Sequence, residues 1–140
     1  MKKPILIDAV FINIGGGLTL FNHLLSSIDD SRNRIYLLLD KRIKNEIKKI
    51  PKSYEVQYID ASIFKRHLFY VKHKESFKKV LCLGNIPPSV NLDSSVYTYF
   101  HQYSYISVPK EVNYFDQIKF HLKIFLLKIF IKNTDKWLVQ

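Results

Sequence analysis

The sequence predicts one α/β domain in which helices cover both faces of a parallel β-sheet. Three observations predict it. Short apolar runs alternate with helical stretches, one apolar run leads through a glycine turn into a helix, and 47% of the residues are hydrophobic, as in ordinary globular proteins. Neighbouring parallel strands need crossover connections, which the intervening helices supply. We therefore expect residues 1–140 to form a single doubly wound, Rossmann-like domain.

The chain begins with a strand, a glycine turn and a helix. The apolar run at residues 5–11 is typical of a buried strand, and apolar residues recur at helical spacing over residues 18–28. Gly15, Gly16 and Gly17 stand between the two. Backbone N–H groups uncovered at a helix N-terminus favour an anion such as a phosphate. The glycines form a candidate phosphate-binding loop, although a tight turn with close helix packing would use them equally well.

The later elements follow the same alternation. Further strands are expected at residues 35–40, 55–60, 80–85, 96–101 and 137–140, and further helices at residues 41–50, 63–77 and 111–132. Pro51 ends the first of these helices. In the second, Phe64, Leu68 and Val71 share one face. Part of the third is expected to belong to the core, and its lysines interrupt it before the roughly 20 apolar residues needed to span a bilayer.

The net charge of +10 is concentrated in two segments. Residues 41–52 and 65–79 each hold six Lys or Arg against one Glu, so each contributes +5 and the rest of the chain is neutral. Such a segment is either a solvated helix face or an attraction for anionic lipid headgroups or nucleic acid. Because helix-turn-helix, zinc-finger and RNA-binding signatures are missing from the sequence, we expect no nucleic-acid partner. An anionic membrane surface stays a candidate partner.

Cysteine usage and the first residues indicate a cytoplasmic protein. Cys82, the one cysteine, lies in an apolar run, which is typical of a buried side chain in a reducing compartment. The basic residues 1–4 are followed by a short run that carries Asp8 and leads to no cleavage site, so no signal peptide is expected. We therefore expect a cytoplasmic location, peripheral at the inner face of the membrane.

Polar residues and glycines follow the predicted strands. In doubly wound sheets, ligands bind outside the carboxyl ends of the strands. Those ends carry Gly15–Gly17, Asp40, Asn85, His101 and Gln102. A neutral imidazole there could donate to a sugar hydroxyl or transfer a proton, which makes His101 the candidate catalytic residue. The amino ends of the strands show no comparable chemistry, so we expect the site at the carboxyl edge.

Motif tests exclude several chemistries. The glycines are not followed by Lys-Ser or Lys-Thr, which excludes a P-loop, and the sequence has no C-x-x-C, H-E-x-x-H or G-x-S-x-G. We therefore expect no bound metal and no resident cofactor. The dinucleotide fingerprint is half present, since Gly15 and Gly17 match but Leu20 replaces the third glycine. Asp40, 23 residues after Gly17, stands where a ribose-binding carboxylate would lie, so a nucleotide- or dinucleotide-binding module without transferase activity is the alternative function.

Five strings in order along the chain carry a resemblance: residues 7–17, 37–42, 83–88, 99–102 and 136–140. They resemble the N-terminal half of bacterial GT-B type retaining glycosyltransferases that build surface polysaccharides. The resemblance implies that the domain holds the acceptor and that Gly15, Gly16 and Gly17 face the donor diphosphate. It implies further that His101 contacts the transferred sugar and that Asn85 and Gln102 lie on the acceptor side.

The chain departs from this family after residue 140. In the family a second Rossmann-like domain follows and binds the nucleotide sugar, so we expect this chain to be one half of the enzyme, which needs a C-terminal donor-binding domain or a separate chain. Donor and acceptor must be held in one closed cleft, so little transfer is expected from this half alone. The expected function is movement of a hexose from a nucleotide sugar to a lipid-linked or glycan acceptor.

Overall fold

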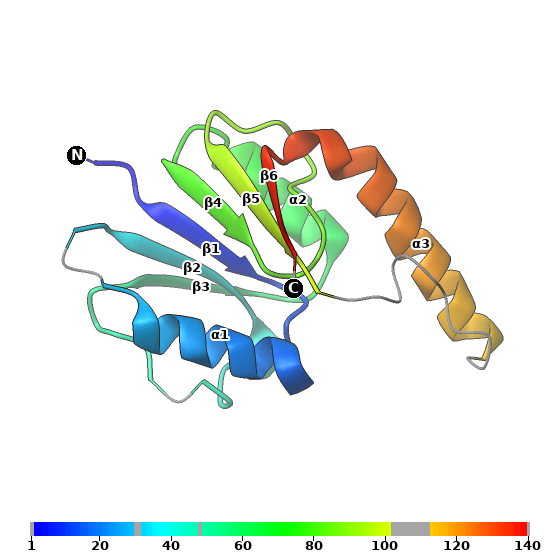
Figure 1. Ribbon diagram of the computed structural model, residues 1–140, viewed down its shortest axis with the longest axis horizontal. Helices are drawn as coiled ribbons and strands as arrows, with labels where there is room; N and C mark the ends of the chain where they lie inside the picture. Colours follow the sequence, from blue (N-terminus) through cyan, green and yellow to red (C-terminus); the bar gives the residue numbers. More distant parts are fainter. Residues whose placement is uncertain (1, 30–31, 48, 102–112, 140) are drawn as a thin grey trace.

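The computed structural model describes residues 2–29, 32–47, 49–101 and 113–139 as one α/β domain around a parallel sheet of six strands. The strand order is β3-β2-β1-β4-β5-β6 (Figure 1). The strands are β1 (Ile5–Ala9), β2 (Ile35–Asp40), β3 (Glu55–Ile59), β4 (Lys79–Cys82), β5 (Ser95–Phe100) and β6 (Lys136–Val139). The helices are α1 (Gly15–Ser27), α2 (Ile63–Lys72) and α3 (Tyr114–Phe130), with short 3₁₀ helices η1 (Lys41–Ile43) and η3 (Ile131–Asn133). The predicted doubly wound fold is confirmed.

The chain reverses direction across the sheet between β3 and β4. It runs outward from β1 through β2 to β3, then crosses back to place β4 on the other side of β1. Strands β1 and β4 are therefore neighbours, with Ile7 beside Leu81 in register. In an open parallel sheet this switch point is where the loops separate and leave a crevice at the carboxyl edge.

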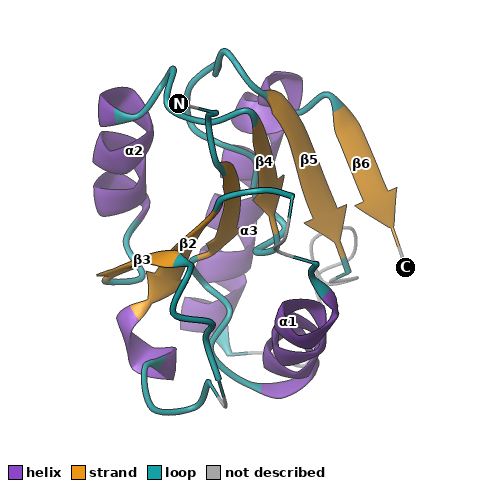
Figure 2. Ribbon diagram, turned by 90° about the vertical axis from the view of Figure 1, so that its left-hand side faces the viewer, coloured by secondary structure: helices purple, strands orange, loops and turns teal. Residues whose placement is uncertain are grey.

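Two hydrophobic clusters form the core, one on each face of the sheet. Side chains of a strand alternate between faces, so Leu6 and Val10 belong to one cluster while Ile7 and Ala9 belong to the other. Helix α1 covers the second face and α2 covers the first (Figure 2). The inner strands β1 and β2 are almost wholly buried, which explains why both are continuous apolar runs.

The helix predicted at residues 41–50 is wrong. Its place is taken by the single turn η1 and further turns. The carboxylate of Asp40 accepts a hydrogen bond from the backbone N–H of Arg42, and Ile43 is buried beneath the turn. The turn is capped by Asp40, and Ile43 alone fills the adjacent part of the core. The isoleucines at helical spacing therefore do not form a helix.

Helix α2 is shorter than predicted and is oriented differently. It begins after Ser62, whose hydroxyl accepts from the N–H of Lys65, and it ends at Lys72 instead of residue 77. The face formed by Phe64, Leu68 and Val71 is exposed. The side of α2 that meets the sheet carries Phe69, Tyr70 and Arg66 instead.

Helix α3 contributes no buried residue, so the expectation that part of it belongs to the core is wrong. Asn113 caps it by accepting from the backbone N–H of Asp116 at 3.0 Å. The helix connects β5 to β6 and extends away from the sheet at its N-terminal end (Figure 1). Among the residues that the structure describes, no helix has the length and apolar content to cross a membrane.

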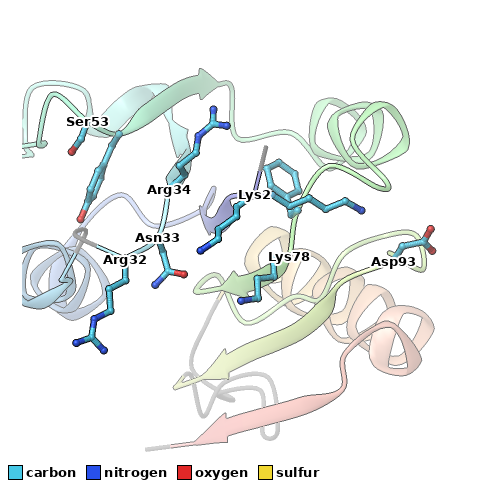
Figure 3. A pocket seen from close by; sticks show the side chains of 10 residues that line it. Lys2, Arg32, Asn33, Arg34, Ser53, Lys78 and Asp93 are labelled. Atoms are coloured by element: carbon cyan, nitrogen blue, oxygen red, sulfur yellow. The ribbon is translucent and has the colours of Figure 1, made fainter.

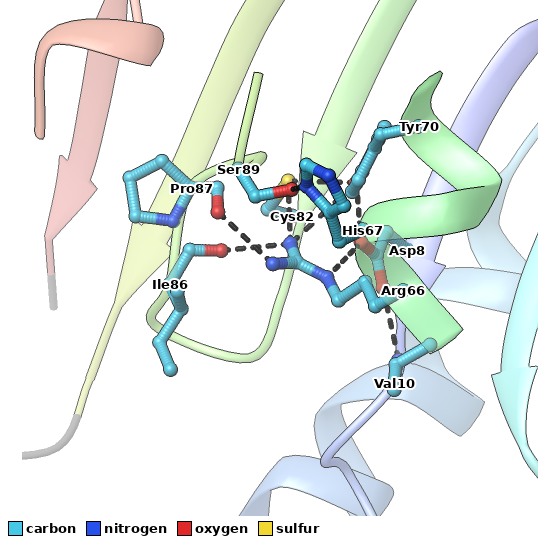
Figure 4. Close-up of polar contacts among 9 residues, drawn as sticks. All are labelled: Asp8, Val10, Arg66, His67, Tyr70, Cys82, Ile86, Pro87 and Ser89. Atoms are coloured by element: carbon cyan, nitrogen blue, oxygen red, sulfur yellow. Dashed lines mark hydrogen bonds and ion pairs between the residues drawn. The ribbon is translucent and has the colours of Figure 1, made fainter. Parts of the chain in front are cut away.

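A buried ion pair joins α2 to β1. Arg66, 3% exposed, donates from Nε to the carboxylate of Asp8 at 2.7 Å, and Asp8 is 1% exposed (Figure 4). The other oxygen of Asp8 accepts from the backbone N–H of Val10 at 3.0 Å, and Tyr70 donates its hydroxyl to the carboxylate. Two charged side chains can be buried only when they are paired and their remaining donors and acceptors have hydrogen-bond partners. Asp8 and Arg66 meet both conditions.

The same arginine holds the loop that follows β4. Its guanidinium donates to the carbonyl oxygens of Ile86 at 2.8 Å and Pro87 at 2.9 Å. Burial would lower the pKa of Arg66, but the interactions with Asp8, Tyr70 and Cys82 together outweigh it and raise that pKa, so the arginine stays charged. Burial, followed by the charge of Asp8, raises the pKa of Cys82 to about 12, which keeps this thiol protonated and unreactive.

Removing one charge of the buried pair should be costly. We predict that Asp8→Asn lowers the free energy of unfolding by about 3–5 kcal/mol, because the guanidinium then loses its counter-charge in the core. Urea denaturation followed by circular dichroism measures the change. Glu55→Gln is the matched control: it removes the carboxylate of the half-exposed Arg34–Glu55 pair and should cost at most about 1 kcal/mol. Equal costs for the two variants would contradict the prediction.

Candidate functional site

A cavity of about 400 Å³ lies at the carboxyl edge of the sheet, at the switch point between β1 and β4. It is bounded by the turn after β1, the start of α1, the loop after β4, the end of β5 and one side chain of α3. Its lining comprises Phe11, Ile12, Asn13, Ile14, Gly16, Gly17, Gly84, Asn85, His101 and Lys123. Four residues predicted as site residues, Gly16, Gly17, Asn85 and His101, therefore meet in one place, as the rule for open parallel sheets predicts.

The N-terminus of α1 forms one wall of this cavity. Gly15 opens the helix with φ +66°, a conformation that side chains rarely adopt. The preceding Ile14 offers no side-chain cap, and the first turn carries no acidic residue. The N–H groups of this turn are therefore not capped by a neighbouring side chain, and the positive end of the helix dipole faces the cavity.

The loop after β4 forms the opposite wall. Gly84 approaches β1 so closely that an added Cβ would lie 2.7 Å from the carbonyl oxygen of Val10. Asn85 follows with φ +64° and uses its side-chain oxygen to accept from the backbone N–H of His101 at 2.9 Å. This hydrogen bond joins the end of β5 to the loop after β4 and fixes the position of the His101 backbone.

His101 lies between the two walls. Its ring stacks on Tyr99 with centroids 5.2 Å apart, and Nε2 lies 3.7 Å from where a Cβ on Gly17 would be. Nδ1 is buried and has no hydrogen-bond partner within the described part of the chain. Burial lowers the pKa of His101, so the imidazole is neutral at pH 7 and can both donate and accept a hydrogen bond.

Asp40 lies at the end of β2, where the sequence predicted a ribose contact, but its carboxylate is already engaged. It accepts hydrogen bonds from the backbone N–H and the guanidinium of Arg42 and from the backbone N–H of Phe11. Burial alone would raise the pKa of Asp40, but the hydrogen bonds from Arg42 hold it below its usual value. Its side chain is fully buried, so it supports the turn after β1 and offers no free oxygen to a ligand.

Six lining residues, among them Phe11 and Lys123, were not predicted as site residues, and one predicted residue cannot be placed. Phe11 adopts φ +78°, unusual for a bulky residue, and no sequence signal marks it. Lys123 reaches the cavity from α3, a contact between elements that periodicity does not predict. Gln102, predicted on the acceptor side, lies outside the described residues.

The amino edge of the sheet carries a charged hollow that the sequence did not predict. A larger cavity of about 720 Å³ lies there, and cationic side chains from three segments surround it (Figure 3). The cations are Lys2, Lys3, Arg32, Arg34 and Lys78, with Asp93 as the acid of the lining. The hollow could not be predicted from the sequence because these residues flank the strands and come together only in the folded chain. Among the described residues that line this hollow there is neither a helix N-terminus nor a histidine, the two features that distinguish the carboxyl edge.

Comparisons with family models, curated proteins and solved structures found no match to this chain. Within the described ranges, no three His, Cys, Asp or Glu side chains cluster in a way that could hold a metal ion. The strand order and the cavity therefore define the class, a Rossmann-like α/β domain with a crevice at its switch point. Because one fold of this kind supports many functions, the function depends on the residues of that crevice.

Gly84 and Gly16, which lie in opposite walls of the cavity, should respond differently to substitution by alanine. We predict that Gly84→Ala lowers the free energy of unfolding by about 1–3 kcal/mol, because its Cβ would press on the backbone of β1. Gly16→Ala is the control, since nothing lies within 4 Å of its added Cβ. It should leave stability unchanged or raise it by up to about 1 kcal/mol. Thermal and urea unfolding measure both, and a neutral Gly84→Ala would show that the loop does not pack as described.

Proposed function

We propose that this chain is the acceptor-side, N-terminal half of a GT-B type glycosyltransferase that moves a hexose from a nucleotide sugar to a lipid-linked or glycan acceptor. The observation that carries the proposal is the convergence of Gly16, Gly17, Asn85 and His101 on one cavity at the switch point. These four residues belong to the strings in which the sequence resembles that family. A donor-binding domain, continuous with this chain or separate from it, is the partner that the proposal requires.

The cavity supplies groups suited to a sugar diphosphate. The N–H groups and dipole at the start of α1 favour an anion, and Lys123 adds a positive charge at the same cavity. A diphosphate leaving group gains negative charge as the glycosidic bond to it breaks, so fixed donors at this position stabilise the transition state more than the ground state. We assign this role to the turn formed by Gly15–Gly17.

His101 suits contact with the transferred sugar. The neutral imidazole stacks on Tyr99 and the backbone N–H of His101 is held by Asn85, so the residue is positioned before a substrate binds. The imidazole lines the cavity, so a ring nitrogen exposed there can exchange a hydrogen bond with a sugar hydroxyl. Asn85 lines the same cavity, where its side-chain oxygen accepts from the backbone N–H of His101, and we assign it to the acceptor side.

The alternative is a dinucleotide-binding module without transferase activity. It depends on Asp40 as the ribose ligand, and that carboxylate is buried and bonded to Arg42. A ribose could reach it only by breaking these hydrogen bonds. The geometry therefore favours the sugar-transfer proposal, and we expect no saturable NAD binding by calorimetry at millimolar ligand.

The proposal is tested by joining this chain with a donor-binding half and measuring nucleoside diphosphate release from a panel of nucleotide hexoses. We predict that His101→Ala lowers turnover by about 10²- to 10⁴-fold, because a positioned polar contact to the reacting sugar is lost. His23→Ala is the control, since that exposed histidine lies on α1 outside the cavity and should leave turnover unchanged.

Two results would overturn the proposal. Full activity of His101→Ala would remove this residue from the site. Saturable NAD binding that Asp40→Ala abolishes, with no hexose transfer by any assembled pair, would establish the binding module instead. Circular dichroism of each variant confirms that the fold is retained.

A further inference from the structure

Helix α3 shows a row of large apolar side chains to solvent. Six of them are between 44% and 75% exposed: Tyr114, Phe115, Ile118, Leu122, Phe125 and Ile129. Four of the six also line a shallow apolar groove of about 450 Å³, together with Gln117 and His121. Scattered exposed apolar residues are normal, but a continuous row of this kind marks a surface that contacts an apolar phase.

The row is one face of the helix. At 100° per residue its six members fall within a sector of about 100°, the width of an amphipathic stripe. The partly buried apolar residues Phe120, Ile124 and Leu127 fall on the other side, toward the rest of the protein. The helix is thus apolar on two faces, of which the domain covers one. The lysines of α3 lie between these two faces.

The charges beside the row are positive. From Asn113 to Asn133 the chain holds four lysines against Asp116, a net charge of +3. Lys119 borders the row on one side and Lys128 on the other, both exposed. A second copy of this chain would bring the same positive helix against this one, within a protein of net charge +10. The cores of protein interfaces are depleted in lysine, whereas lysines bordering an apolar stripe are typical of helices at an anionic lipid surface.

We propose that α3 is a membrane-docking helix that lies in the plane of an anionic bilayer, with Leu122 and Phe125 at the centre of its inserted face. Its 17 residues span about 25 Å, enough for a helix lying along the surface. Apolar burial and attraction of lysines to anionic headgroups act together in such binding. The contact lies on α3, whereas the described residues of the basic segment 41–52 form only the single turn η1 and further turns.

Docking by α3 would also place the cavity at the membrane. Lys123 belongs to this helix and lines the cavity that contains His101. A substrate anchored in the bilayer could therefore reach the cavity without leaving the lipid surface. The docking inference goes beyond the proposed sugar transfer. Its tests measure membrane binding and do not depend on transferase activity.

Vesicle co-sedimentation tests the inference. The chain should bind phosphatidylcholine vesicles that contain phosphatidylglycerol, bind pure phosphatidylcholine much more weakly, and bind less tightly as salt rises. The double variant Leu122→Glu/Phe125→Glu should lose at least about tenfold in affinity, because it removes two inserted apolar side chains. Both positions are exposed, so the fold should survive. Val56→Glu, a similar change on the exposed side of the far edge strand β3, is the control and should bind like the unchanged protein.

A second measurement separates insertion from surface attraction. Phe125→Trp in a Trp137→Phe background places one tryptophan on the proposed inserted face. Its emission should shift to the blue on vesicle binding and be quenched by nitroxide-labelled acyl chains. Absent binding, equal binding by Leu122→Glu/Phe125→Glu, or binding without quenching would overturn the inference. So would a concentration-dependent dimer that the double variant abolishes, because the face would then be occupied by a second copy.

Discussion

The buried pair of Asp8 and Arg66 is the constraint on which the rest of the structure depends. Arg66 reaches from α2 into the core, and there it meets β1 through Asp8 and the loop after β4 through two carbonyl oxygens. An apolar pair of similar volume could fill the space and leave stability intact, as often happens with buried ion pairs. It could not satisfy the carbonyl oxygens of Ile86 and Pro87, so the ion pair specifies the conformation of that loop.

The loop transmits this constraint to the cavity. Arg66 fixes Ile86 and Pro87, Asn133 donates to the carbonyl oxygen of Pro88 at 2.9 Å, and Asn85 stands next to these anchors. Asn85 in turn receives the N–H of His101. The position of the candidate catalytic imidazole is therefore set by a charge on another strand and by a helix on the far face of the sheet. Without such anchors the loop after β4 would be free to move, and the imidazole of His101 could not be preorganised.

Much of the fold could be predicted because local patterns determine it. The buried strands β1 and β2 are continuous apolar runs, and the glycine turn marks the start of α1 without reference to the rest of the chain. The cavity residues Gly16, Gly17, Asn85 and His101 were found because the carboxyl ends of parallel strands share one edge. Contacts between distant parts of the chain determine the features that local patterns do not predict. Arg66 sits in a lysine-rich segment that indicates a solvated face, and only its partner 58 residues away makes it a core residue.

The central claim is that the ion pair positions His101 through the loop, and amide hydrogen exchange tests it most directly. In Arg66→Met, measured by NMR under native conditions, the His101 amide should lose protection by more than the β5 amides of Val96 and Thr98 do. That result is expected because the hydrogen bond to Asn85 depends on the loop. The Val96 amide donates to Asp135, and Thr98 lies in the pairing of β5 with β6, neither of which involves the loop. A uniform loss of protection at all three amides would show that Arg66 contributes to global stability alone and would contradict the claim.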